Sequence, residues 1–290
     1  MRLLPEKLFI KEIDAKEFLR SYLENSAVSI SGGKDSLVAL DLSYRVGIRK
    51  FVFGNTTLTF PGTEEYLKNL ERYYDIEIEQ VIPPRDFFDL VDDIGFPSQR
   101  LRWCCEVYKF GPLANYVLKN KIKSLITGIR ADESRKRQNY SAISRNPLIP
   151  TTQINPIITW TTEEIWHYIK YYDLPYHPLY NQGYERLGCW MCPFQKVEGF
   201  RRLNKIFPEL YNKLIDALYD NVKKFGKYGV RDINDYINKF AWRKNALPIT
   251  NILVGSIEYW KTNLHTNFLI SCNDISVFSF LKENLKLLKN

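Results

Sequence analysis

The chain has 290 residues, 45% of them apolar, which is enough for one large domain or for an α/β domain with a smaller appendage. No stretch reaches the roughly 18 consecutive apolar residues of a membrane span, and the first residues lack the apolar core of a secretory signal, so we expect a cytoplasmic protein with no membrane partner. A formal net charge of +8 favours anionic partners such as nucleotides or nucleic acid.

The most informative stretch follows the first apolar segment, which we predict to be a strand over residues 27–30. The stretch consists of Ser31, Gly32, Gly33, Lys34, Asp35 and Ser36, and an apolar-periodic helix is expected from Leu37 to Val46. Two glycines let backbone N–H groups approach a ligand closely, and the helix N-terminus and the lysine add positive charge. The stretch therefore predicts a phosphate or pyrophosphate loop. It is not the Walker form, because the lysine is followed by Asp35 rather than by Ser or Thr.

Strand and helix patterns alternate after this loop. We expect strands over residues 50–55, 76–82 and 124–128, and helices over residues 62–74 and 107–119. Such alternation predicts an α/β fold with an open, mainly parallel twisted sheet and helices on both faces. Because ligands bind at the carboxyl ends of parallel strands, we expect Ser31, Asn55 and residues 128–130 to line one crevice.

The rest of the chain is predicted to be mainly helical. Thr161 and Glu164 form a capping-box pattern that should begin a helix ending near Tyr172. Beyond residue 195 the pattern becomes helical and basic, and strand candidates over residues 251–254 and 267–271 indicate a small α/β appendage. We therefore expect a nucleotide-binding domain over residues 1–195 and a basic helical C-terminal region over residues 196–290.

Four of the five cysteines fall into two close pairs, Cys104 with Cys105 and Cys189 with Cys192. In a cytosolic chain such pairs more often bind metal or carry out redox chemistry than form structural disulfides. Four thiolates suit tetrahedral zinc or an iron–sulfur cluster, and buried structural thiols are a third interpretation. Adjacent cysteines are unusual for zinc, whose paired ligands are usually separated along the chain, so we favour the cluster.

Together, the loop and the cysteines resemble the phosphoadenosine phosphosulfate (PAPS) reductase family, above all its adenylyl-sulfate (APS) branch, within the adenine-nucleotide alpha-hydrolase superfamily. Further motifs follow in family order: Asn55-Thr56 with Phe60-Pro61-Gly62-Thr63, the arginine motif from Thr127 to Arg135, and Asn155-Pro156 followed by the segment from Leu174 to Tyr180. The resemblance spans residues 25–195. It implies the superfamily's α/β fold, a [4Fe–4S] cluster on Cys104, Cys105, Cys189 and Cys192, and an adenine nucleotide (APS, PAPS or ATP) at the loop.

The resemblance and the side-chain chemistry together define a candidate site. The candidate nucleotide-binding residues are Ser31, Gly32, Gly33, Lys34, Asp35, Ser36, Asn55, Thr56, Gly128, Arg130 and Arg135. Lys34 and Arg130 are also candidate catalytic residues, because their positive charges suit phosphate or sulfate, and Arg137 lies in the same basic stretch. Asp35 would help to position Mg²⁺ if the ligand is ATP.

One motif of the family is missing from this sequence. Family reductases attack the sulfur of the activated sulfate with a cysteine in a C-terminal Glu-Cys-Gly-x-His motif, and a thioredoxin-like reductant then resolves the thiosulfonate. The remaining cysteine here is Cys272, in an apolar strand candidate that lacks the following Gly-x-His. Cys272 is the candidate nucleophile, although a packed, buried thiol is the favoured interpretation of such a residue.

Three functions are compatible with these observations. The first is a PAPS-reductase-like enzyme of sulfur metabolism that binds an adenine nucleotide beside a four-cysteine iron–sulfur cluster. The second is an ATP-dependent sulfur transferase, in which the cluster or a persulfide from a sulfur donor supplies sulfur to a tRNA base or another acceptor activated by adenylation. The third is a nucleotide-binding regulator without turnover. The order and spacing of the motifs favour the first.

Overall fold

The computed structural model describes residues 4–135, 137–225, 230 and 232–244. Cys272 and the strand candidates over residues 251–254 and 267–271 lie outside these residues. The chain divides into two compact units, of which unit 1 comprises Met1–Ile82 and Pro112–Cys189, and unit 2 comprises Pro83–Gly111 and the chain from Trp190 onward. None of the described helices combines the length and the apolar character that crossing a bilayer requires.

Among the described residues, unit 1 is built on a six-stranded sheet with the order β3-β2-β1-β4-β6-β5. The strands are β1 (Ser26–Ile30), β2 (Phe51–Gly54), β3 (Ile78–Val81), β4 (Ser124–Ile126), β5 (Ile143–Arg145) and β6 (Thr152–Ile154). Neighbouring strands run parallel, except that β5 is antiparallel to β6. The order reverses at β1, because β2 and β3 extend the sheet on one side of it and β4 begins the other side. In open sheets such a reversal opens a crevice at the carboxyl ends of the strands.

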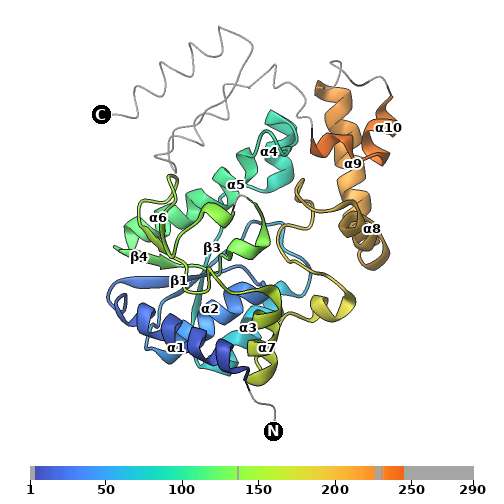
Figure 1. Ribbon diagram of the computed structural model, residues 1–290. Coiled ribbons are helices and arrows are strands. Elements are labelled where there is room, and N and C mark those ends of the chain that lie inside the picture. The colour runs from blue at the N-terminus through green and yellow to red at the C-terminus, as the bar shows by residue number, and fades with distance from the viewer. Residues whose placement is uncertain (1–3, 136, 226–229, 231, 245–290) are drawn as a thin grey trace, which may run out of the picture. The chain divides into compact units, whose positions relative to one another are not determined.

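The helices of unit 1 cover both faces of the sheet, as predicted. They are α1 (Glu6–Arg20), α2 (Lys34–Arg45), α3 (Thr63–Tyr74), α6 (Gly111–Lys119) and α7 (Thr162–Tyr171). Figure 1 shows α1, α2, α3 and α7 on one face and α6 on the other. Right-handed crossovers account for this arrangement. The connections through α2 and α3 move in one direction across the sheet, whereas the return to β4 moves in the other and brings α6 to the opposite face.

Helix α2 lies at the centre of the hydrophobic core of unit 1, and every residue from Ser36 to Ser43 is buried. The adjoining strands β1 and β2 are also almost entirely buried, which explains why they read as short apolar runs rather than as alternating patterns. One carboxylate lies within this core. Asp41 accepts hydrogen bonds from the hydroxyls of Tyr74 at 3.0 Å and Tyr168 at 2.7 Å, and it pairs with Arg45 at 2.6 Å. Asp41 thereby ties α2 to α3 and α7.

The structure confirms the predicted fold class and most of the predicted elements. The bounds of β1 to β4, α2 and α3 lie within three residues of those expected, and α7 begins with the predicted capping box of Thr161 and Glu164. The sequence pattern did not predict β5, β6 or α1. The two strands are three residues long, too short to show alternation, and the buried face of α1 is interrupted by the polar Glu12.

Unit 2 is helical where the structure describes it. Its helices are α4 (Phe87–Ile94), α5 (Trp103–Cys105), α8 (Val197–Ile206), α9 (Pro208–Phe225) and α10 (Ile233–Asn238). A π-helical turn, Glu106–Phe110, follows α5 directly, and such turns are frequent at functional sites. Aromatic rings make up much of the core. Phe87 stacks on Trp103 with ring centroids 5.6 Å apart, and Phe200 meets Trp242 edge to face at 5.7 Å.

Burial makes His177 of unit 1 sensitive to protonation. Its side chain is 2% exposed, Nδ1 accepts a hydrogen bond from the Leu179 N–H at 3.2 Å, and Nε2 lies 3.4 Å from Thr63 Oγ1. Burial lowers the pKa of His177. The folded state therefore favours the neutral ring. The contribution of neutral His177 to the free energy of unfolding is present above the unfolded-state pKa of about 6.5. This contribution is lost as the pH falls below that value.

Between about pH 7 and pH 5, we expect the free energy of unfolding of the wild type to fall by up to about 1.4 kcal/mol per pH unit more than that of His177→Asn, which cannot take up the proton. Urea unfolding at a series of pH values measures the difference. His167→Asn, at an exposed position on α7, is the matched control and should keep the wild-type pH dependence. Identical pH dependence in the wild type and His177→Asn would contradict the expectation.

Candidate functional site

The glycine-containing loop, residues 31–36, is braced by its own serines. Gly32 adopts a φ of +76°, in the left-handed region, and Gly33 leads into α2 with no side chain capping the helix N-terminus. The hydroxyl of Ser36 accepts a hydrogen bond from the Ser31 N–H at 3.1 Å and donates to the Gly33 carbonyl at 2.9 Å. The loop is thus held in shape from within, and it presents a helix N-terminus of the kind that binds anions.

The chain that leaves β4 touches this loop through Gly128. A Cβ at this position would lie 2.5 Å from the backbone carbon of Asp35 and 2.6 Å from both the Asp35 carbonyl oxygen and the Ser36 nitrogen. A side chain at position 128 would therefore displace the first turn of α2. Because β1 and β4 are neighbours where the strand order reverses, the loop and Gly128 lie at the carboxyl ends of these strands, which is the position where open sheets of this kind bind ligands.

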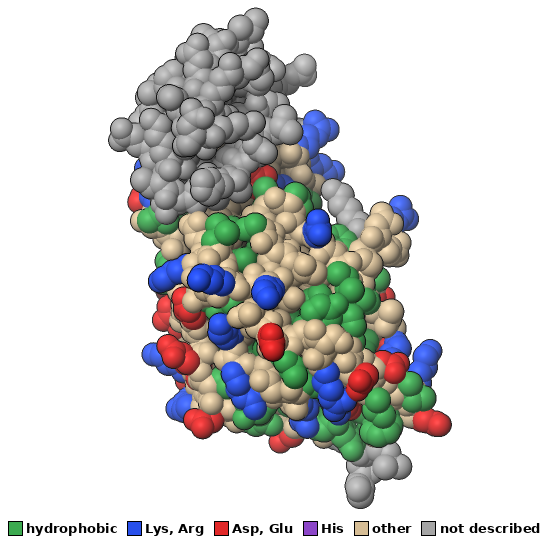
Figure 2. All heavy atoms as spheres, turned by 90° about the vertical axis from the view of Figure 1, so that its left-hand side faces the viewer, with side chains coloured by type: hydrophobic (Ala, Val, Ile, Leu, Met, Phe, Trp, Pro, Cys, Tyr) green, Lys and Arg blue, Asp and Glu red, His purple; other side chains and the backbone are tan. Residues whose placement is uncertain are grey.

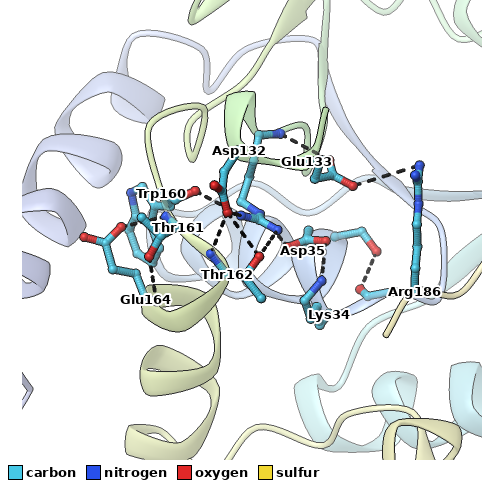
Figure 3. A network of polar contacts seen from close by, with 12 residues as sticks. Lys34, Asp35, Asp132, Glu133, Trp160, Thr161, Thr162, Glu164 and Arg186 are labelled. Atoms are coloured by element: carbon cyan, nitrogen blue, oxygen red, sulfur yellow. Dashed lines mark hydrogen bonds and ion pairs between the residues drawn. The ribbon is translucent and has the colours of Figure 1, made fainter. Parts of the chain in front are cut away.

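Arg130 links the loop to α7, and Figure 3 labels its partners Asp35 and Thr162. Its side chain is 1% exposed, and its Nε donates to Asp35 Oδ1 at 2.7 Å. Nη1 donates to Asp132 Oδ2 and to the Trp160 carbonyl, both at 3.1 Å, and Nη2 donates to Thr162 Oγ1 at 3.1 Å. Every guanidinium nitrogen thus has an acceptor within unit 1. Arg130 fastens Asp35 to the N-terminal turn of α7.

The carboxylate of Asp35 also receives the side chain of Lys34. Lys34 Nζ lies 3.0 Å from Asp35 Oδ2, and the lysine is 5% exposed. On the other side of Arg130, the Thr162 backbone N–H, followed by Arg130 itself, holds the pKa of Asp132 below its usual value. The loop is therefore continuous with a chain of ion pairs that runs from Lys34 to Asp35 to Arg130 to Asp132.

Tyr180 meets the loop from the 3₁₀ turn Pro178–Gln182. Its hydroxyl accepts a hydrogen bond from the Lys34 N–H at 2.9 Å, and its ring centroid lies 5.9 Å from Lys34 Nζ. The ring packs against Trp166, with centroids 5.1 Å apart, and burial raises the pKa of Tyr180. The neutral hydroxyl of Tyr180 thus occupies the first backbone donor of α2, which is a donor that a phosphate would use.

The other predicted nucleotide-binding residues make separate contacts. Asn55 follows β2, and its Nδ2 donates to Gln80 Oε1 at 3.2 Å. Thr56 is buried, with its Oγ1 3.3 Å from Cys189 Sγ. Arg135 is exposed. The structure therefore brings residues 31–36, Gly128 and Arg130 into direct contact, whereas Asn55, Thr56 and Arg135 lie at other points of unit 1.

The predicted metal ligands lie on both sides of the division of the chain. Cys104, Cys105 and Cys192 belong to unit 2, and Cys189 is the last residue of unit 1. All four are thiols rather than disulfides. Among the described residues, no group of three or more His, Cys, Asp or Glu side chains is arranged to hold a metal ion.

The three cysteines of unit 2 nevertheless share a thiolate-favouring environment around Arg102. Arg102 Nη2 donates to Cys105 Sγ at 3.5 Å. A hydrogen bond from Cys104, together with the charge of Arg102, lowers the pKa of Cys105 to about 5. Burial acts to lower the pKa of Arg102, but the neighbouring cysteines raise it. Cys105 has the largest effect, followed by Cys104 and Cys192. Metals bind cysteine as thiolate, so the chemistry of this donor set suits a metal.

Sequence reasoning missed three side chains that shape the site. These side chains are Tyr180, Thr162 and Arg186. Tyr180 ends a segment singled out only for its resemblance to the family. Thr162 stands next to the capping residue Thr161, and Arg186 is three positions before Cys189. Arg186 Nη2 lies 4.0 Å from Glu133 Oε1, which brings it to the same network (Figure 3). No local pattern distinguishes these residues, because each reaches the site through a contact made far along the chain.

Comparison with known proteins agrees with this architecture. Residues 25–195, more than half of the chain, match the family model described as the phosphoadenosine phosphosulfate reductase domain. The chain belongs to this PAPS reductase family. An adenosine 5'-phosphosulfate reductase of Staphylococcus haemolyticus is 30% identical over 181 residues, which cover 60% of this chain and 72% of that enzyme.

Two further similarities concern length and fold. An uncharacterized protein of Methanocaldococcus jannaschii is 34% identical over 223 residues, which cover 76% of this chain and 52% of that protein. The chain spans about half the length of this relative and of a second one from the same organism. The crystal structure of a PAPS reductase from Candida auris, a phosphate complex, superposes with a TM-score of 0.51 at 20% identity, covering 66% of this chain and 97% of that one. This likeness shows that the two share a fold.

Gly128→Ala should disturb the loop, because its Cβ would overlap backbone atoms of Asp35 and Ser36. We expect the free energy of unfolding to fall by about 1–3 kcal/mol and the binding of inorganic pyrophosphate to weaken. Urea unfolding and calorimetric titration measure the two effects. Gly188→Ala is the matched control, because an added Cβ there meets nothing within 4 Å. Wild-type stability and binding in Gly128→Ala would show that the close approach is not needed.

Tyr180→Phe should leave the Lys34 N–H without its acceptor while keeping the ring. Because the hydroxyl then no longer competes with the ligand, we expect pyrophosphate to bind about two- to tenfold more tightly and stability to fall by about 0.5–1.5 kcal/mol. Tyr176→Phe, which removes a hydroxyl bonded to Asn181 at 2.9 Å, is the control for calorimetry. Weaker binding by Tyr180→Phe would mean that the hydroxyl contacts the ligand itself.

Proposed function

We propose that this chain binds an adenine nucleotide, APS, PAPS or ATP, at residues 31–36 and that it is a PAPS-reductase-like enzyme of sulfur metabolism. The observation that carries this proposal is the loop: a glycine turn leads into a helix whose N-cap residue, Gly33, has no side chain, at the point where the strand order reverses, and Gly128 packs against its first turn. Backbone N–H groups in this setting favour phosphate or pyrophosphate. Membership of the family, and relatives named adenosine 5'-phosphosulfate reductase, support a nucleotide that carries sulfate.

The proposed roles within the loop follow from the contacts that each side chain makes. The backbone of Gly32, Gly33 and the first turn of α2 would bind the phosphates, and Lys34 would contribute its charge from the same turn. Arg130 donates from every guanidinium nitrogen to protein acceptors, so we propose that it positions Asp35 and leaves direct contact with the ligand to the loop. Asn55, Thr56 and Arg135 are proposed contacts for the remainder of the nucleotide.

Cys104, Cys105, Cys189 and Cys192 are the proposed ligands of a [4Fe–4S] cluster, with zinc as the alternative metal. The support is chemical: the pKa of Cys105 is lowered to about 5, and Arg102 stabilises thiolate charge next to it. When bound, a cluster would supply a fixed local charge that acts on an anionic substrate.

The reductase reaction that we propose requires a two-electron donor. A cysteine thiolate would attack the sulfate sulfur of APS, which breaks the bond to the phosphate oxygen, releases AMP and forms a thiosulfonate. A dithiol of the thioredoxin kind would then release sulfite, regenerate the cysteine and become a disulfide. Cys272, which lies outside the described residues, and a cysteine supplied by a partner are the proposed sources of the nucleophile.

Sulfur transfer to tRNA would need an extended surface for nucleic acid. Figure 2 shows one face of the molecule, on which Lys and Arg side chains are interspersed with Asp and Glu side chains. Proteins that bind nucleic acid usually gather their positive charge into a patch or stripe. The face in Figure 2 shows no such gathering, and sulfur transfer to tRNA is one outcome of the test.

The test begins with anaerobic purification and quantification of iron, sulfide and zinc. The protein is then incubated with a dithiol and APS, PAPS or ATP. We expect iron and sulfide in the protein, and sulfite with AMP from APS or with adenosine 3',5'-bisphosphate from PAPS. Lys34→Ala should weaken nucleotide binding about tenfold or more, because a charge next to the phosphates is lost. Lys50→Ala, at an exposed position of unit 1, should bind as the wild type does.

Three other results would replace this proposal. ATP consumption that depends on RNA would indicate sulfur transfer. Tight nucleotide binding with no product from any of the three nucleotides would indicate a regulator. No nucleotide binding at all would remove the proposed role of the loop.

A further inference from the structure

Two guanidinium groups outside the loop share a single carboxylate. Glu133 ends the 3₁₀ turn Ala131–Glu133, and its Oε2 forms an ion pair with Arg137, while its Oε1 lies 4.0 Å from Arg186 Nη2. Figure 3 shows Arg186 reaching Glu133 from the side opposite Asp132. The two arginines come from segments about fifty positions apart in the chain, and Glu133 holds both at one place.

The charges of this network do not balance. Among the described residues, its ion pairs join four cations, Lys34, Arg130, Arg137 and Arg186, to three carboxylates, Asp35, Asp132 and Glu133, whereas Glu164, which also appears in Figure 3, pairs with Lys11 outside this set. Asp35 already pairs with Lys34 and Arg130, and Asp132 pairs with Arg130. Glu133 therefore pairs with two guanidinium groups, those of Arg137 and Arg186. The excess positive charge belongs to Arg137 and Arg186.

This excess is unfavourable in the protein without a ligand. The side chain of Arg137 is only 27% exposed, and burial together with the charge of Arg186 lowers its pKa to about 10. A guanidinium group ordinarily stays protonated well above that value. An anion placed between the two arginines would offset both the burial and the repulsion.

Both arginines lie within electrostatic reach of the loop. The Arg130 N–H donates to Glu133 Oε2 at 3.4 Å, and Arg130 Nε donates to Asp35 Oδ1 at 2.7 Å, so the carboxylate that pairs with both arginines is linked to the loop through Arg130. A ligand whose first phosphate occupied the N-terminus of α2 would therefore have its next anionic group close to this pair. Arginine suits that group, because its planar fork can bind two oxygens of a tetrahedral anion.

We propose that Arg186, paired with Arg137 across Glu133, completes an oxyanion subsite that binds the terminal sulfate or phosphate of a nucleotide held at residues 31–36. The inference rests on the proposed nucleotide binding and adds a residue that sets specificity for that site. Arg186 makes the subsite selective for ligands that carry a second anionic group, and it contributes little to the binding of AMP.

Arg186→Ala is a suitable test, because the side chain is 66% exposed and its removal leaves the Glu133–Arg137 pair in place. Calorimetric titration compares the binding of AMP, ADP and APS to the wild type, Arg186→Ala and Arg186→Lys. We expect Arg186→Ala to weaken ADP and APS about tenfold or more and AMP less than about twofold. Arg186→Lys should lie between them, because it keeps the charge and loses the fork. Arg20→Ala, at a side chain 57% exposed on α1, is the matched control and should match the wild type.

The same titrations show whether the subsite binds a sulfate group or a phosphate group. A loss confined to APS identifies a sulfate subsite, and a loss confined to ADP identifies a phosphate subsite. Equal weakening of AMP, ADP and APS, or no weakening of any, would overturn the inference.

Inorganic pyrophosphate serves as a second probe that does not depend on the adenine nucleotide. If the wild type binds pyrophosphate in a manner that requires Arg186 but binds none of the nucleotides, the subsite stands and the proposed function fails. If nucleotides bind and Arg186→Ala binds them as the wild type does, the proposed function stands and the subsite fails. If the wild type binds neither nucleotides nor pyrophosphate, both proposals fail.

Discussion

Arg130 and Asp35 form a buried ion pair on which the geometry of the candidate site depends. The two side chains are 1% and 16% exposed, and their closest nitrogen and oxygen lie 2.7 Å apart. Removing one partner of such a pair typically costs about 3–5 kcal/mol, because the other charge is left buried and uncompensated. The guanidinium is therefore held where Asp35, Asp132, Trp160 and Thr162 can all accept from it. These contacts fix the positions of the glycine loop, the end of β4 and the first turn of α7 relative to one another.

The same arrangement is compatible with the proposed binding of an anion, although the candidate site contains several carboxylates. Asp35 and Asp132 are committed to Arg130 and Lys34, so their charges are balanced within the protein. The positive groups that remain are the N-terminus of α2 on one side and Arg137 and Arg186 on the other. A linear ligand with two anionic groups matches this distribution better than a single phosphate does.

Local patterns account for the parts of this structure that the sequence could predict. The strand, glycine turn and helix around residues 31–36 are contiguous, as are the residues of the capping box, so propensity and spacing describe them well. The role of Arg130 could not be predicted in the same way. Its position after a strand suggested contact with the ligand, but its acceptors at Trp160 and Thr162 come from a segment thirty residues away. Tyr180 and Arg186 escaped notice for the same reason, since only the tertiary fold brings them to Lys34 and Glu133.

Gly128 has a further consequence for how this protein can change over time. Because the backbone of residues 35 and 36 already fills the space beside it, no side chain can be accepted there without moving the helix that carries Asp35. Replacing Asp35 by a neutral residue would leave the buried Arg130 without this partner. Gly128, Asp35 and Arg130 therefore constrain one another. A substitution at any one of them alone gives a less stable protein. Functional divergence of this site is consequently easier at its exposed edge, where Arg135 and Arg186 can be replaced one at a time.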